Sequence, residues 1–232
     1  MTIAHGLCGY AAIVLLVRRR HAHSSSPGVT VGDLRLAGTL VSAGAVLDVL
    51  DGPVARRFGS SGLGDLLDGM CDTVTFGVVP AAAVAASSST VSTPANWALT
   101  GAGGAYLTAM ILRLVRSEMT PADELKRGFQ GLPSAPASGA ALSAVALNAP
   151  PPVTCLLVVT VAALTVGDYH YPRQRPAVLP IIAGGPAIGL LGIWGILPRR
   201  PALIVTMVST IALPVGAASA AWRRRRTHAR AT

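Results

Sequence analysis

The sequence predicts an all-α fold, a polytopic integral membrane helical bundle with six to eight transmembrane helices. The first observation is composition: 51% of the 232 residues are hydrophobic, only 12% are charged, and the mean hydropathy is +0.55. Soluble domains carry about 25% charged residues. The second observation is that apolar runs alternate with short polar breaks along the whole chain. No boundary for a soluble domain interrupts this pattern, so we expect one transmembrane domain over residues 1–232.

Eight apolar segments account for the expected helices. A straight helical span needs about 20 apolar residues, so the first, fifth and sixth segments are short. Polar or proline-rich breaks, such as residues 87–94 and 148–152, separate neighbouring segments. The basic residues Arg18 to Arg20 follow the first apolar run instead of preceding it, which argues against a signal peptide. In order, the segments are 2–17, 34–50, 63–85, 97–115, 134–148, 153–167, 178–197 and 201–222.

Positive charge predicts the orientation, because loops rich in Arg and Lys stay in the cytoplasm. With eight spans, one side receives the basic residues near 56, 116–127 and 173–175 and the basic tail 223–232, so we expect this side and both termini in the cytoplasm. Arg18 to Arg20 and the pair Arg199 and Arg200 fall on the other side, against this rule. The net charge of +9 is explained by orientation and anionic lipids, and no nucleic-acid partner is expected.

Acidic residues are concentrated in one apolar stretch, because five of the ten fall between residues 48 and 72. Ionised groups in a membrane are costly, so they indicate a function. Asp48 and Asp51 are spaced i, i+3 and Asp68 and Asp72 are spaced i, i+4, so each pair projects from one face of its own helix. Four carboxylates in one cavity require cations between them. Such oxygen ligands suit Mg²⁺ or Mn²⁺, and two ions suit a pyrophosphate.

Small and basic residues flank the aspartates. Gly52 and Ala55 leave space beside the first pair, and Arg56 offers a planar fork for phosphate. Gly64 lies one helical turn before the second pair and permits close approach of a helix or a ligand. The same small residues are also typical of ordinary helix packing. Arg56 is also typical of a basic residue that only sets the membrane orientation. Asp65, near the start of its helix, is expected to be structural.

The pattern Asp48-x-x-Asp51-Gly52-x-x-Ala55-Arg56-x7-Gly64-x3-Asp68-x3-Asp72 resembles the signature of the CDP-alcohol phosphatidyltransferases. These are membrane enzymes that join a CDP-activated lipid to an alcohol. Further runs resemble the serine branch of this family, the phosphatidylserine synthases. Residues 75–81 are similar to S-F-G-V-A-P-A, and 113–116 to the start of R-L-A-R-F-N. Residues 129–134 are similar to F-x-G-L-P-x-P, 171–172 to the start of Y-P-S, and, weakly, 2–12 to T-x-x-N-x-x-C-G.

The resemblance implies phospholipid biosynthesis by a transferase that moves a phosphatidyl group from CDP-diacylglycerol to L-serine and releases CMP. It implies that the four signature aspartates hold two ions, Mg²⁺ or Mn²⁺, and that Asp72 is also the catalytic base. The CDP-lipid would lie against Gly52, Ala55, Arg56 and Gly64. The resemblance further implies a homodimer in a bacterial cell membrane, with the active site facing the cytoplasm.

Residues 116–134 are expected to form a cytoplasmic lid or acceptor loop. The run from Thr120 to Asp123 is typical of a helix start, with threonine as the N-cap and proline at N1. The run from Lys126 to Gly128 is typical of the end of a short helix. Arg113, near the inner end of a span, needs a negative partner, which could be the aspartates, a substrate phosphate or a serine carboxylate. Arg116 has either an acceptor-binding or a topogenic role.

Three alternatives remain open from the sequence. The acceptor could be glycerol 3-phosphate or an inositol phosphate. The phosphates of either would need a basic pocket, which could be formed by Arg113, Arg116, Lys126 and Arg127. A divalent-cation transporter would also place aspartates in membrane helices, but it would not need Gly52, Ala55 and Arg56 at these spacings. A catalytically silent relative would bind lipid only, although all four aspartates are present.

Overall fold

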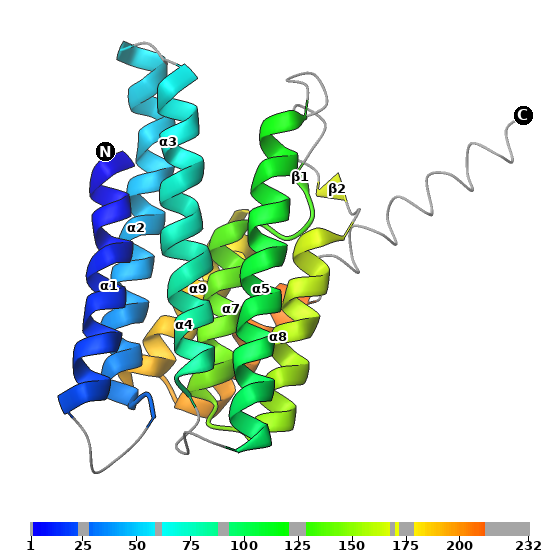
Figure 1. The fold of residues 1–232 in the computed structure, drawn as a ribbon. Coiled ribbons are helices and arrows are strands. Elements are labelled where there is room, and N and C mark those ends of the chain that lie inside the picture. The colour runs from blue at the N-terminus through cyan, green and yellow to red at the C-terminus, as the bar shows by residue number, and fades with distance from the viewer. Residues whose placement is uncertain are drawn as a thin grey trace, which may run out of the picture.

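The computed structural model describes residues 2–22, 28–58, 62–87, 93–120, 129–167, 170–171 and 179–211. These residues form a bundle of long helices that run along one another, which confirms the expected all-α bundle (Figure 1). In the described part of the chain, extended structure is confined to β1 (Phe129–Gln130) and β2 (His170–Tyr171), which pair antiparallel.

The first half of the bundle carries the signature residues. Helix α1 (Thr2–Ala22) packs along α2 (Val31–Phe58). The start of α2 is fixed by a reciprocal cap, in which the Asp33 carboxylate accepts hydrogen bonds from the backbone N–H and the hydroxyl of Thr30 at 2.9 and 2.7 Å. Helix α3 (Gly62–Asp72) continues directly into the π-helix η1 (Thr73–Val78) and then α4 (Val79–Ala85).

The second half closes the bundle. It contains α5 (Pro94–Met119), α7 (Ser134–Ala146), α8 (Pro151–Val166), α9 (Leu179–Trp194) and a last helix described over residues 199–211. The hydroxyl of Thr93 accepts a hydrogen bond from the backbone N–H of Asn96 and caps α5, with proline at the first helical position. Helix α5 packs on α4 and α8, and α7 lies between α2, α8 and α9.

Hydropathy and length single out two described helices that could cross a membrane, Leu66–Ala85 and Pro94–Met119. The first of these includes the end of α3, all of η1 and all of α4. Helices such as α2 have a lower mean hydropathy because they carry charged residues, including Asp33, Arg35 and Asp48. The larger count of six to eight spans therefore remains a prediction.

Hydrogen bonds between helix ends show which ends lie together. The backbone N–H of Val29 donates to the carbonyl of Ala86 at 3.1 Å, whereas Arg116 donates to the carbonyl of Val166 at 2.8 Å. The end of α2, the start of α3 and the end of α5 all lie at the upper end of the bundle (Figure 1). This is the alternation that the eight-segment topology requires.

The structure also gives a reason for one exception to the charge rule. Arg199 donates a hydrogen bond to the carbonyl of Ala146, the last residue of α7. Carbonyl groups at the end of a helix carry partial negative charge, so a cation is stabilised there. The positive charge at Arg199 therefore has a packing role, independent of membrane orientation.

Candidate active site at the junction of α1, α2 and α3

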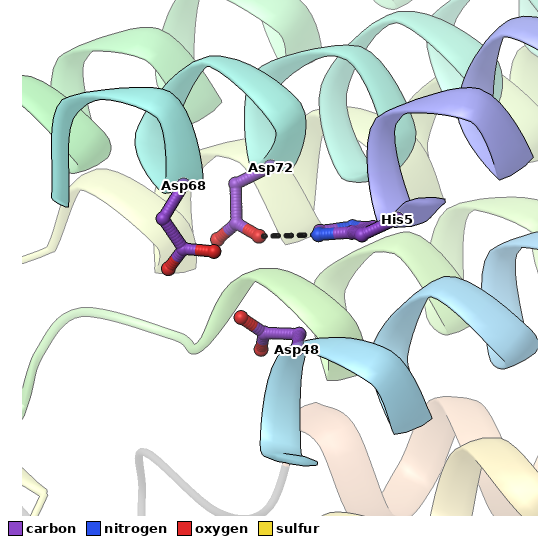
Figure 2. A group of neighbouring side chains, drawn as sticks. All are labelled: His5, Asp48, Asp68 and Asp72. Atoms are coloured by element: carbon purple, nitrogen blue, oxygen red, sulfur yellow. Dashed lines mark ion pairs between the residues drawn. The ribbon is translucent and has the colours of Figure 1, made fainter. Parts of the chain in front are cut away.

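Four side chains from three helices converge on one point. Asp48 comes from α2, Asp68 and Asp72 come from α3, and His5 comes from α1 (Figure 2). One ligand atom from each of these residues lies within 4.8 Å of those from the other three. His5 is fully buried and Asp72 is 8% exposed, whereas Asp48 and Asp68 are half-buried. The structure therefore brings together three of the four aspartates that the sequence singled out.

The two carboxylate oxygens of Asp72 face different partners. Its Oδ2 accepts a hydrogen bond from the hydroxyl of Ser134, the first residue of α7, at 3.2 Å. Its Oδ1 faces Nδ1 of His5 at 3.8 Å. Since a hydrogen bond fixes the direction of a carboxylate, Ser134 orients Asp72 toward the other acidic side chains.

His5 was not predicted from the sequence. Its backbone carbonyl accepts a hydrogen bond from the hydroxyl of Thr75 at 3.3 Å, and its ring packs on Phe76 with the ring centroids 5.0 Å apart. Both partners belong to η1, the π-helix that begins directly after Asp72. A π-helical turn inside an α-helix frequently marks a functional site. The sequence contains one indication of this role. In the similar run T-x-x-N-x-x-C-G, a polar residue, asparagine, occupies the position of His5.

Arg113 adds a positive charge beside the acidic side chains. It lies in α5, is 8% exposed, and is close enough to Asp72 and Asp48 to attract both carboxylates. With its carboxylates ionised, as metal binding requires, this group would carry a charge of −2 together with the guanidinium. A divalent cation would neutralise that charge, and carboxylate oxygens are the ligands that such ions prefer. The side chains present therefore fit a bound divalent metal.

Arg116, the other basic residue expected at the acceptor site, lies one turn further along α5 and is half-buried. Its guanidinium donates to the carbonyl of Val166, the last residue of α8. This contact is typical of a basic residue that stabilises a helix C-terminus. The structure thus gives Arg116 a role in joining α5 to α8.

Several expected site residues lie partly or wholly outside the described part of the chain. Gly64 is described and is half-buried in α3, one turn before Asp68. The backbone of α2 includes four other signature residues whose side chains are not described, namely Asp51, Gly52, Ala55 and Arg56. The side chain of Asp65 is also undescribed, and most of the expected lid, including residues 121–128, lies outside the described residues.

An apolar cavity of about 380 Å³ opens beside Asp48. It lies between α2, α7 and α9 and is lined largely by aliphatic side chains and proline, among them Val46, Leu50, Pro136 and Leu190. Asp48 is the charged residue in this lining, so the wall of the cavity carries one acidic side chain and is otherwise mainly apolar. Such a space suits a ligand with a charged head and a hydrocarbon body.

Comparison with known proteins gives the family. The family model described as CDP-alcohol phosphatidyltransferase matches residues 1–170. The chain is 40% identical over 83 residues to CDP-diacylglycerol–serine O-phosphatidyltransferase of Mycobacterium leprae, which covers 35% of this chain and 26% of that protein. It is 31% identical over 157 residues to phosphatidylcholine synthase of Bradyrhizobium diazoefficiens, which covers 66% of this chain and 55% of that protein.

The chain therefore spans about a quarter of the first relative and just over half of the second. The family match, in contrast, covers well over half of this chain and includes all four residues of the cluster. The resemblance that the aspartate pattern indicated is confirmed: the chain belongs to the CDP-alcohol phosphatidyltransferase family.

Proposed function

We propose that this protein transfers a phosphatidyl group from CDP-diacylglycerol to L-serine, giving phosphatidylserine and CMP. The observation that carries the proposal is the meeting of Asp48, Asp68 and Asp72 next to the apolar cavity that opens at Asp48. An acidic centre that can hold divalent ions suits the pyrophosphate of the donor, and the adjoining cavity suits its lipid part.

The metal centre would be formed by Asp48, Asp68 and Asp72, joined by Asp51 on the strength of the family signature. We expect two ions per site, Mg²⁺ or Mn²⁺. When bound, these ions would neutralise the pyrophosphate and stabilise CMP as the leaving group. Gly52, Ala55, Arg56 and Gly64 remain our candidates for contact with the CDP-lipid.

The chain itself would supply the base and the alignment. Asp72 would take the proton from the serine hydroxyl, while Ser134 keeps the carboxylate pointed at the site. The hydroxyl oxygen would then form a bond to the lipid-side phosphorus as the bond from that phosphorus to the CMP oxygen breaks. Most of the rate enhancement in such a transfer comes from positioning and electrostatics.

Arg113 supports serine as the acceptor. A buried guanidinium beside the reacting centre can bind the serine carboxylate through two parallel hydrogen bonds. Choline is a second candidate, because the Bradyrhizobium relative is a phosphatidylcholine synthase. Choline has no carboxylate, however, and a buried arginine would repel its quaternary ammonium group.

The remaining features of the proposal concern the whole protein. We propose a single catalytic domain over residues 1–232, with a lid formed by residues 116–134 and a basic tail at 223–232. The site would face the cytoplasm of a bacterial cell, since the end of the bundle that holds Asp68 and Arg116 is the one expected to be rich in positive charge. A homodimer is proposed from the resemblance.

The test is CMP release by the purified protein in detergent, with CDP-diacylglycerol and Mn²⁺ or Mg²⁺. Serine, choline, glycerol 3-phosphate and inositol phosphate are offered separately. Release with serine alone would support the proposal, and release with another alcohol would replace serine as the acceptor. No release with any of the four alcohols would contradict the proposed chemistry.

A further inference from the structure

We propose that His5 supplies a nitrogen ligand to the metal centre and thereby makes this centre selective for Mn²⁺ over Mg²⁺. The inference rests on the proposed function, because it requires that the aspartate cluster hold the ion. It goes beyond that function in adding a ligand from a third helix, α1, to the proposed aspartates and in naming the ion that the site prefers.

The positions of the ligand atoms carry the first step. Figure 2 shows the imidazole of His5 pointing at Asp72, with Asp48 and Asp68 on the adjacent sides of the same space. The 3.8 Å between Nδ1 of His5 and Oδ1 of Asp72 is too long for a hydrogen bond. It matches the separation expected for two ligand atoms of one ion, which lie roughly 3 to 4 Å apart when each bond is about 2.1 Å long.

The surrounding structure holds the imidazole in this place. The Thr75 hydroxyl bonds to the backbone carbonyl of His5, and Phe76 packs against one face of the ring. On the α2 side, a Cβ added to Gly44 would lie 2.8 Å from Cδ2 of His5, so glycine is needed there to admit the ring. Gly44 lies one helical turn before Asp48, and the same turn of α2 therefore seats the ring and provides a carboxylate.

Ligand chemistry supplies the selectivity. Mg²⁺ strongly prefers oxygen ligands and keeps its water molecules, whereas imidazole nitrogen binds well to first-row transition ions. A ligand set of carboxylates and one imidazole therefore favours Mn²⁺ relative to a set of oxygen ligands alone. Asparagine at this position, as in the similar N-terminal run, would offer oxygen instead of nitrogen.

The test is pulsed electron paramagnetic resonance of the full-length protein in detergent, loaded with Mn²⁺. This method detects the magnetic coupling between Mn²⁺ and a directly bound imidazole nitrogen. We expect this coupling in the wild-type protein and its loss in His5→Asn, with Mn²⁺ still bound. Equilibrium binding should show that His5→Asn weakens Mn²⁺ by about 10- to 100-fold, as for loss of a metal-site contact, and changes Mg²⁺ far less.

Two glycine variants give a second approach should His5→Asn fold poorly. Gly44→Ala keeps every ligand but displaces the imidazole, so it should weaken the nitrogen coupling. Gly104→Ala is the matched control, because a Cβ added at Gly104 meets no atom within 4 Å among the described residues. It should leave the spectrum unchanged.

The outcomes separate this inference from the proposed function. Mn²⁺ that binds in an Asp68-dependent manner without nitrogen coupling would overturn the role of His5 and leave the proposed metal centre intact. Coupling that persists in His5→Asn would assign the nitrogen to another residue and would also overturn it. Mn²⁺ binding that is absent, or unchanged in Asp68→Asn, would remove both the centre and the inference.

Discussion

Replacing Gly103 by alanine should separate α4 from α5. Gly103 is buried in α5, and a Cβ added to it would lie 2.7 Å from the backbone oxygen of Ala81 in α4. Carbon–oxygen contacts in proteins are normally about 3.3 Å or longer, so the two helices must move apart by roughly 0.6 Å. Because that oxygen belongs to the backbone, it cannot turn aside as a flexible side chain could.

The adjacent glycine provides the matched control. Gly104 is exposed, and a Cβ added to it meets no atom within 4 Å in the described part of the chain. Both substitutions gain the helix preference of alanine over glycine, about 1 kcal/mol, so this contribution cancels in the comparison. Only Gly103→Ala suffers the overpacking, which typically costs about 1 to 3 kcal/mol.

Thermal unfolding of both variants in the same detergent measures the difference. For a chain of this length, each 1 kcal/mol corresponds to about 2 to 4 °C, so Gly103→Ala should unfold several degrees below Gly104→Ala. CMP release should also be lower in Gly103→Ala, because α4 continues from η1 and a shift of α4 reaches Asp72. Equal unfolding temperatures would refute the close contact between α4 and α5.

Four further substitutions address the site and its basic neighbours. Asp72→Asn should lower turnover by about 10²- to 10⁴-fold, the range for loss of a general base, and leave CDP-diacylglycerol binding largely intact; normal CMP release would remove Asp72 as the base. Asp68→Asn should raise the metal concentration needed for half-maximal CMP release by about tenfold or more, and an unchanged metal requirement would contradict its assignment as a ligand. Arg113→Ala should raise KM for serine about 10- to 100-fold, as for loss of a charged hydrogen bond. Arg116→Ala should mainly lower the unfolding temperature, and the reverse pattern would exchange the roles of the two arginines.

The fold class and the aspartates could be predicted because their signals are local. Composition alone indicates a membrane bundle, and helical spacing alone places Asp68 and Asp72 on one face of a helix. The structure confirms that this face meets Asp48 of α2. The pairing of α2 with α3 could be predicted because carboxylates in a membrane are tolerated only when they share a cation or another charged partner.

Other features depend on contacts between distant residues, and no local pattern reports them. The hydrogen bond from Arg116 to Val166 joins residues 50 positions apart. The position of Arg116 near a helix end therefore does not predict which carbonyl it binds. No local pattern reports the π-helical form of residues 73–78, although the run 75–81 resembles a family sequence. Tyr106 helps to explain this turn, because its hydroxyl donates to the carbonyl of Phe76 at 2.8 Å.

The same close helix contacts that build the site also hold α1 in the bundle. A Cβ added to Gly6 would lie 2.7 Å from Sγ of Cys71, and one added to Gly9 would lie 2.5 Å from the hydroxyl oxygen of Thr75. Small residues allow such approach in a membrane, where lipid competes equally for apolar side chains and packing must supply the attraction. Because α1 is seated this tightly on α3 and η1, His5 is carried into the acidic centre. An ion bound there would join α1, α2 and α3 through their own side chains, so metal binding and the packing of these helices stabilise one another.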